Sequence, residues 1–412
     1  MKKILLGTTG LIGAALLATA ANAETPKVTL GGFADFQAGY TSDDFDDSYN
    51  AIGFRNDNTV SVRVDGKTNG GLGYGAVIDL EADVDSTNRD FGSSDADNQG
   101  INASRTFTYL SGNWGRAEMG SVESSAATMR VDASTLAVAT GGINGAWNYF
   151  VNPASTDSST LTDGIPFITT SKLVAEHGNP ENIGDETYYN ATKLNYYSPK
   201  ISGFQVGASY TPNLKGRGQD LGRQNDFGIN FSEPFDQNHV WNGALSYDNQ
   251  FENGLRVAAA VTGEISKAAD STSGREYEGI RAYNVGALVG FQGFSLAGSY
   301  GDWTDSTQRN QPTGPGATVR SGDANYWTVG GGYEAGPVGL SVTYLNSTFE
   351  ESSIASGSND FSNVVVGADY KLAPGLTPYA EVSFYDIDQD GSGTNVYDNQ
   401  GTVFLLGTQV AF

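Results

Sequence analysis

The chain has 412 residues, a formal net charge of −24 and no cysteine. The lack of cysteine excludes disulfides, thiolate metal sites and a cysteine nucleophile, and the acidic charge excludes nucleic-acid binding, which needs a basic surface. The mean hydropathy of −0.32 fits a soluble protein and a membrane barrel equally well, because only alternate residues of a barrel strand meet lipid.

Residues 1–23 have the layout of a secretory signal peptide. The start is basic, residues 4–17 are mostly apolar, and Ala-Asn-Ala at 21–23 forms an A-x-A cleavage site. A membrane anchor is disfavoured because the apolar run is short and broken by glycines. The sequence therefore predicts a signal peptide at 1–23 and one mature domain at 24–412.

From residue 28 onwards, stretches of about ten residues alternate between apolar and polar side chains, as transmembrane strands do. In the first stretch, Leu30 and Phe36 share one face, while Asp35 and Gln37 share the other. Sixteen strands are predicted in this way, at about 28–40, 59–66, 72–84, 103–111, 115–122, 191–199, 203–212, 239–249, 254–265, 280–291, 293–302, 324–335, 337–349, 361–372, 376–387 and 401–412.

The connections between these strands alternate between short and long. The long ones lie at about 41–58, 85–102, 123–190, 213–238, 266–279, 303–323, 350–360 and 388–400. Outer-membrane barrels place short turns on the periplasmic side and long loops outside, and an even strand number lets the sheet close. The pattern predicts an all-β, transmembrane antiparallel β-barrel of 16 strands, integral to the outer membrane.

The segment 123–190 is too long for an ordinary connection. It is rich in apolar and aromatic residues, such as Trp147 and Phe150, which disorder does not favour. We therefore expect this segment to be packed, and in a barrel the lumen has the space to hold it.

Several long segments are acidic. One cluster holds Asp43, Asp44, Asp46 and Asp47, and another holds Asp90, Asp95 and Asp97. Either these carboxylates are only solvated, or divalent cations such as calcium bridge them to anionic lipid headgroups. The stretch 386–391 resembles the start of a calcium loop, but Tyr397 stands where the bidentate Glu is required. No cofactor and no metal site are predicted.

At three places the chain resembles the general porins of Gram-negative outer membranes, in particular the alphaproteobacterial kind. These places are the mature start at 28–35 (VTLGGFAD), the stretches 193–199 (KLNYYSP) and 203–210 (GFQVGASY), and the end at 404–412. The resemblance implies a homotrimer in contact with outer-membrane lipid and lipopolysaccharide, and a third external loop folded into the pore. It also implies that the barrel-assembly machinery recognises a C-terminal signal, here Phe404, Leu406, Val410 and Phe412.

In such a channel, carboxylates on the infolded loop would face cationic residues on the wall. Solutes would then be selected by their size and by the electric field between these charges. The pore-wall candidates are the charged residues that the alternation places on the inward face of a strand: Arg63, Asp65, Asp79, Glu81, Asp83, Arg116, Glu118 and Arg256. The constriction-loop candidates are Glu123, Asp132, Asp157 and Asp163. The alternative for each residue is that it is merely paired or hydrated in a wet lumen. The direction in which Arg105 points is ambiguous, because Arg105 lies on the same strand face as the aromatic residues Phe107 and Tyr109.

Aromatic residues near strand ends are interpreted as interfacial girdles. These are Tyr210, Tyr247, Tyr300, Trp303, Trp327, Tyr333, Tyr344 and Tyr370. The sequence contains no G-x-S-x-G, H-E-x-x-H or P-loop motif, so we expect no enzymatic activity. The predicted function is passive diffusion of ions and small hydrophilic solutes, with a mild cation preference. A channel specific for a sugar or an anion, or a plugged structural barrel, is the alternative.

Overall fold

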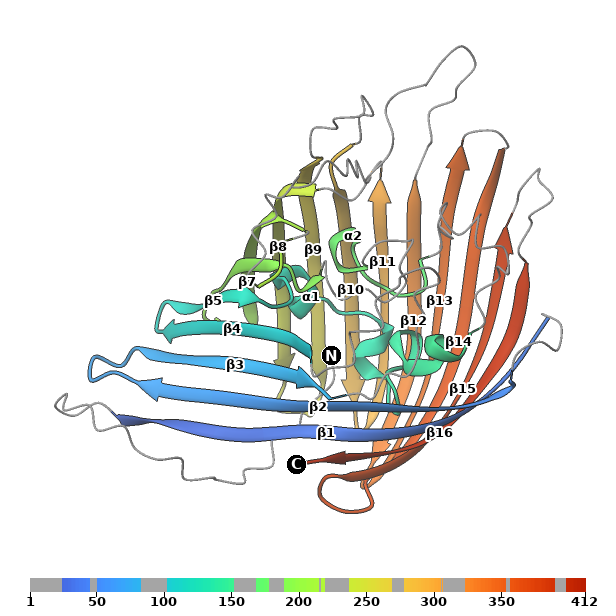
Figure 1. The fold of residues 1–412 in the computed structure, drawn as a ribbon, viewed down its shortest axis with the longest axis horizontal. Helices are drawn as coiled ribbons and strands as arrows, with labels where there is room; N and C mark the ends of the chain where they lie inside the picture. Colours follow the sequence, from blue (N-terminus) through green and yellow to red (C-terminus); the bar gives the residue numbers. More distant parts are fainter. Residues whose placement is uncertain are drawn as a thin grey trace, which may run out of the picture.

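The computed structural model describes residues 24–44, 50–82, 102–151, 168–177, 189–214, 216–218, 237–268, 278–304, 306, 323–352, 356–389 and 398–412. In this part of the chain, sixteen strands form one closed antiparallel barrel (Figure 1). Each strand pairs with the next in sequence, and the last strand closes onto the first. Closure leaves no unpaired sheet edge to face lipid, which confirms the predicted fold class.

The strands differ from their predicted bounds by only a few residues, with one exception. The first eight are β1 (Glu24–Asp43), β2 (Ile52–Lys67), β3 (Gly73–Glu81), β4 (Asn102–Gly112), β5 (Gly115–Ser121), β6 (Thr192–Tyr197), β7 (Phe204–Asn213) and β8 (Gln237–Gln250). The others are β9 (Arg256–Ala268), β10 (Arg281–Phe291), β11 (Phe294–Thr304), β12 (Ala324–Ala335), β13 (Val338–Ser352), β14 (Ser356–Tyr370), β15 (Leu376–Gln389) and β16 (Asn399–Ala411). The exception is β2, which begins seven residues before the predicted 59.

The prediction was wrong for residues 52–58 because Asn and Asp there are typical of loops. The segment nevertheless alternates, with Ile52 and Phe54 exposed on the outer face and Arg55 on the inner face. It pairs with β1 along its whole length. The first long connection is therefore shorter than the predicted 41–58.

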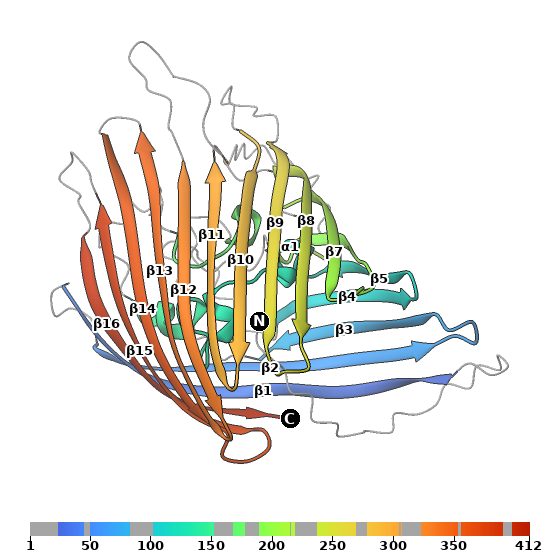
Figure 2. The ribbon, with the colours of Figure 1, turned by 180° about the vertical axis from the view of Figure 1, so that it is seen from behind.

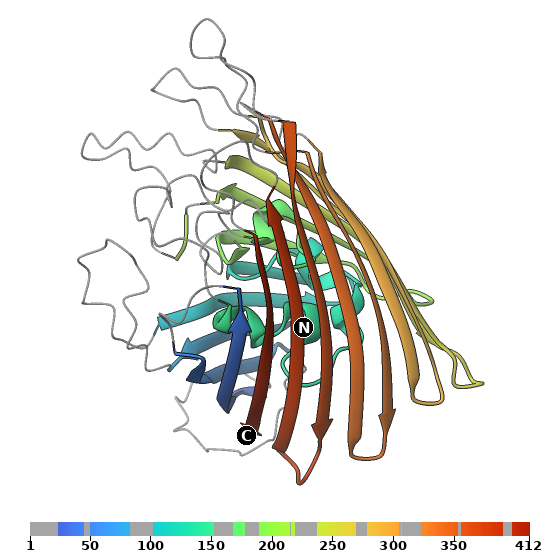
Figure 3. The same ribbon diagram turned by 90° about the vertical axis from the view of Figure 1, so that its right-hand side faces the viewer.

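The opposite walls cross steeply. In Figures 1 and 2, β1 and β2 run almost at right angles to β9 and β10. Strands tilted by about 40° to the barrel axis produce such a crossing between the front and back walls. Figure 3 shows the short helices of the β5–β6 connection lying between the walls. Within the described residues, none of the helices has the length and apolar character needed to cross a bilayer.

Exposure alternates along the strands as predicted. On β1, Phe36 is 51% exposed, while Asp35 and Gln37 are buried on the inner side. The residues of the predicted C-terminal signal, on β16 and directly after it, are all exposed on the outer side, whereas Leu405 is fully buried. The outer face is therefore apolar, and the inner face carries most of the polar groups.

The outer face carries two rows of paired aromatic rings. One row, near the short turns, contains the pairs Phe204–Tyr247 and Phe294–Tyr333. The other, near the long connections, contains Tyr210–Trp241, Tyr283–Tyr300 and Trp327–Tyr344. On β7, β8, β11 and β12 the two rows are six residues apart, about 20 Å along the strand. Such rows match the interfacial girdles of membrane barrels.

Trp303 does not belong to these girdles, and its prediction was wrong. It is only 4% exposed and packs inside with Tyr326 and Ile280. Its indole nitrogen donates a hydrogen bond to the carbonyl of Lys172, 3.1 Å away, in the β5–β6 connection. Trp303 lies three positions after the outward Tyr300, so the alternation of the strand turns it into the lumen.

Candidate functional site

The β5–β6 connection lies against the inner wall of the barrel. Its described part contains the short helices α1 (Ser125–Met129), η1 (Ala133–Leu136), η2 (Gly142–Asn144), η3 (Ala146–Phe150) and α2 (Val174–His177). Its backbone amides donate hydrogen bonds to inward side chains of distant strands. The acceptors are Ser209 on β7, Glu264 on β9, Thr328 on β12, Ser341 and Thr343 on β13, and Glu381 on β15.

These hydrogen bonds have a clear physical role. Amides that are not in regular structure need acceptors when they are buried, and the inward Ser, Thr and Glu side chains supply them. The amide of Ile143 lies 3.0 Å from Thr343 Oγ1, and the Thr140 hydroxyl lies 2.5 Å from Glu381 Oε1. The wall thus fixes the path of the connection through the lumen.

A buried charge cluster ties the connection together. Arg130 forms ion pairs with Asp132 at 2.8 Å and with Glu176 at 2.7 Å. Its side chain is 12% exposed, and both carboxylates are 3% exposed or less. Asp132 also accepts hydrogen bonds from the hydroxyls of Ser134 and Ser171. We call Arg130, Asp132 and Glu176 the loop anchor.

The two carboxylates of the loop anchor respond differently to burial. Burial tends to raise the pKa of Asp132, but Arg130 and the two serine hydroxyls overcome this, so the pKa lies below its ordinary 3.8. For Glu176, burial wins over the attraction of Arg130 and Lys172, and the nearby Glu123 adds to it, so the pKa lies above its ordinary 4.5.

This difference predicts a pH dependence for Glu176. A carboxyl whose pKa is raised on folding contributes stability that is fully present below about pH 4.5 and is lost as the pH rises through the folded-state pKa. The wild-type protein should therefore gain thermal stability relative to Glu176→Gln as the pH falls from 7 towards 4.5. Parallel melting curves of the two proteins test this, and a constant difference across that range would contradict it.

The predicted wall residues of β2 and β5 lie together. Arg63 pairs with Asp65 at 2.9 Å, and Arg116 pairs with Glu118 at 2.7 Å. The Tyr109 ring lies between the two pairs, with the Arg116 guanidinium 3.8 Å from its centroid and its hydroxyl bonded to Asp65. The wall here presents charges in balanced pairs on an aromatic support.

Asp79 is only 2% exposed. It forms an ion pair with Arg105 at 2.5 Å and accepts a hydrogen bond from Ser61 at 2.6 Å. The ambiguity of Arg105 is thereby resolved, since it faces inward together with Phe107 and Tyr109. The β3–β4 register shifts after Asp79, and this irregularity places Ser104 on the inner side as well.

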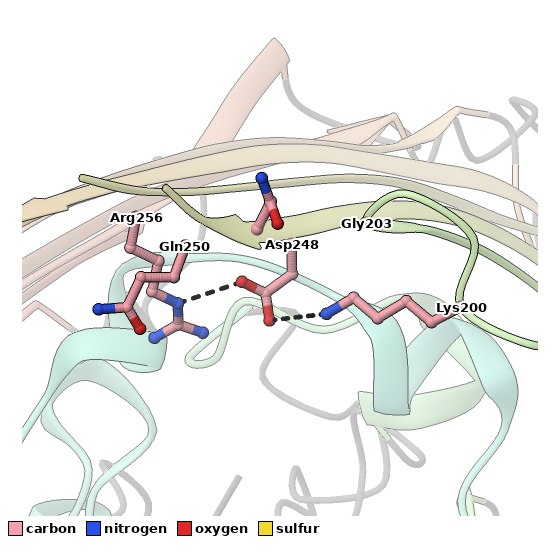
Figure 4. A pocket seen from close by; sticks show the side chains of 6 residues that line it. Lys200, Gly203, Asp248, Gln250 and Arg256 are labelled. Carbon is pink, nitrogen blue, oxygen red and sulfur yellow. Dashed lines mark hydrogen bonds and ion pairs between the residues drawn. The ribbon is translucent and has the colours of Figure 1, made fainter. Parts of the chain in front are cut away.

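Arg256 is the first residue of β9, beside the short turn that follows β8, so it lies at the mouth of the lumen near the short turns. Figure 4 shows it beside Asp248 and Lys200. Its Nε is 3.2 Å from Asp248 Oδ1, and Lys200 Nζ is 3.4 Å from the other oxygen of the same carboxylate. The three side chains are 41–48% exposed and line an open hollow of about 430 Å³. This group is far more solvated than the loop anchor.

The remaining predicted residues divide into two sets. Glu81 and Glu123 are half-buried, and Glu123 lies close enough to Arg105 to interact with its charge. Asp83, Asp157 and Asp163 lie outside the described residues. Asp132 bonds to its own connection and not to the wall arginines. Sequence reasoning missed Arg130 and Glu176, and the only signal was that charged residues occur in an otherwise apolar stretch.

The acidic segments offer no calcium site in the described part of the chain, where no cluster of three or more His, Asp or Glu side chains is arranged to hold a metal. Asp46, Asp47, Asp90, Asp95, Asp97 and Asp390 lie outside the described residues.

Comparison with known proteins agrees with this architecture. A family model described as Gram-negative porin matches residues 8–390. Uncharacterised proteins of Rickettsia felis and Rickettsia conorii are 26% and 25% identical to the chain, with all of both chains covered. Among solved structures, an anion-selective porin from Comamonas acidovorans has a TM-score of 0.57 at 16% identity, covering 94% of this chain and 100% of that one. The outer membrane protein OmpT of Vibrio cholerae has a TM-score of 0.55 at 13% identity, covering 96% and 100%.

Proposed function

Because the chain belongs to the Gram-negative porin family, an outer-membrane channel family, we propose that it is a general diffusion porin for ions and small hydrophilic solutes. The observation that carries this is the polar inner wall. Arg63, Arg116 and Arg256 lie on it as partly exposed, paired charges, which suit hydrated solutes and not one tightly bound substrate. In this role the protein lets solutes pass without reacting with them.

We further propose a mild cation preference. Each of the inward arginines discussed above is paired with a carboxylate, so their charges are largely balanced. The chain as a whole has 47 acidic and 23 basic residues and a formal net charge of −24. This excess of acid supports a lumen that attracts cations.

Segment 123–190 is proposed to narrow the pore, with Glu123, Asp157 and Asp163 as its acidic residues opposite the wall charges, while Asp132 holds the connection in place through Arg130. Its contacts with strands on several sides of the barrel support this assignment. The full assembly is proposed to be a homotrimer of chains that have lost residues 1–23. Assembly is proposed to depend on the C-terminal signal, whose side chains share the exposed outer face.

Planar-bilayer recording of the purified protein tests the proposal. We expect open channels whose conductance grows in proportion to the salt concentration. In a salt gradient, the sign of the reversal potential should show that cations pass more readily than anions. Neutral sugars should leave the current unblocked. Block of the current by one sugar at low concentration would indicate a channel specific for that sugar. A reversal potential of the opposite sign would refute the cation preference. The absence of any channel current would indicate a plugged barrel with a structural role.

A further inference from the structure

The inner wall carries a belt of small side chains across the neighbouring strands β7 to β14. Each member lies on the inward face of its strand, and the members on adjacent strands are direct or diagonal register neighbours. They are Gly207, Ala244, Ala260, Gly286, Ala297, Gly330, Gly332, Ser341 and Gly367. We call these residues the small-residue belt.

The β5–β6 connection follows the small-residue belt in sequence order. Successive residues of the connection lie against successive glycines of the belt: Met129 against Gly207 on β7, Val131 against Gly286 on β10, Leu136 against Gly332 on β12, and Ala139 against Gly367 on β14. Figure 1 shows the same course, from α1 beside β8 and β9 to the short helices beside β13 and β14. Residues 129–139 therefore run along the wall.

A side chain on these glycines would occupy the place of the connection. A Cβ atom on Gly286 would lie only 1.8 Å from the carbonyl oxygen of Val131. Ordinary contacts begin at 3.4 Å, so the Val131 backbone would have to move by about 1.6 Å. Gly286 lies inside a hydrogen-bonded, closely packed sheet that cannot retreat by that distance. The connection would therefore move away from the wall and into the lumen.

Hydroxyl groups of the same wall hold the connection at this short distance. The amide of Ala133 donates to Thr328 Oγ1 at 3.2 Å, and the amide of Val138 donates to Ser341 Oγ at 3.1 Å. Hydrogen bonds of this type extend to only about 3.2 Å, so they break when the backbone leaves the wall. Glycines give the connection room, and hydroxyls keep it in that room.

Open space remains on the other side of the lumen. Arg63 on β2 and Arg116 on β5 are 35% and 30% exposed, so water reaches the wall that faces the connection. We propose that the small-residue belt sets the width of the pore, because it lets the connection lie directly on the wall of β7–β14. In this assignment Gly286 is a positioning residue. The inference rests on the proposed porin function.

The test compares the purified full-length variants in planar bilayers by their single-channel conductance and by the size of the polyethylene glycols that enter the pore. Because conduction depends on pore diameter, Gly286→Ala should lower the single-channel conductance by roughly a third, and Gly286→Val by more. Both variants should exclude smaller polymers than wild type does. The matched control is Gly290→Ala, on the same face of the same strand, where an added methyl group meets its nearest atom at 3.6 Å. It should behave like wild type.

The single-channel conductance separates positioning from a loss of stability. A barrel that is only destabilised gives fewer channels of normal size, whereas a displaced connection gives narrower channels. Gly367→Val on β14 provides a second variant should Gly286→Ala fail to fold. Its added methyl groups would press on Val138 and Ala139, so it should narrow the pore as well.

Two results would overturn the proposal while the porin function stands. One is a conductance and a polymer limit that are the same in Gly286→Ala, Gly367→Val and wild type. The other is a larger conductance in Gly286→Ala, since the connection would then have left the lumen. A wild-type protein without channel current would refute the porin function itself, and the role of the belt with it.

Discussion

Replacement of Arg130 by methionine is expected to release the β5–β6 connection from its place in the lumen. Methionine has a similar length but cannot neutralise Asp132 and Glu176, which are both almost fully buried. Removing one partner of a buried ion pair costs about 3–5 kcal/mol, because the remaining charge is left without compensation. Here two carboxylates lose the same partner.

Two measurements check this expectation. The midpoint of thermal unfolding in detergent should fall, and the single-channel conductance should rise and fluctuate, because the connection no longer holds one path through the pore. The matched control is Arg256→Met at the solvated mouth. Ion pairs exposed to that degree contribute about 1 kcal/mol or less, so its unfolding midpoint should stay close to that of wild type.

A triple variant separates the loss of charge balance from the loss of packing. In Arg130→Met/Asp132→Asn/Glu176→Gln the anchor is neutral throughout, and replacing a whole buried charge cluster often costs little. Its stability should recover most of the loss seen in Arg130→Met. A normal conductance in a destabilised Arg130→Met protein would show that the connection does not line the path of the current.

The periodicity of the sequence predicted the strands well, because it reports a local property. Alternation alone predicted that Asp79 and Glu118 face inward, and both do. The same alternation placed Phe404 and Phe412 on the outer face, where they are exposed. Such patterns need no knowledge of distant residues, since each side chain follows from its neighbours two positions away.

The partners of the inward residues could not be predicted in this way. Arg130 and Glu176 are 46 residues apart, and Asp35 meets Tyr379 across 344 residues. Such contacts depend on how the sheet closes and on where the connection turns. Register irregularities, as after Asp79, add a second difficulty because they change which residues share a face.

The closing seam of the barrel provides the second large expected effect, in the variant Gly407→Ala. Tyr379 on β15 is the register partner of Gly407 on β16, and its hydroxyl donates hydrogen bonds to both oxygens of Asp35 on β1, each at 2.9 Å. The tyrosine therefore spans three strands, including the pair that joins the end of the chain to its beginning. Only a glycine on the middle strand leaves room for the ring.

A methyl group on Gly407 would lie 2.2 Å from Cζ of the Tyr379 ring, so the ring must move away. The buried Asp35 would then lose both hydrogen bonds. Overpacking costs about 1–3 kcal/mol, and a hydrogen bond to a charged group contributes about 1.5–3 kcal/mol. We expect a loss of about 3 kcal/mol, seen as a lower urea midpoint when unfolding is followed by tryptophan fluorescence in detergent.

Two further variants show whether the seam is the cause. Gly243→Ala on β8 is the control, because an added methyl group there meets nothing within 4 Å. Tyr379→Phe keeps the ring but removes the hydroxyl, so it should show only the hydrogen-bond part of the loss, about 1.5–3 kcal/mol. If Gly407→Ala is as stable as Gly243→Ala, the Tyr379 ring can move to another position at little cost in stability. Asp35 must then find its donors elsewhere, and the tyrosine does not hold the first and last strands together.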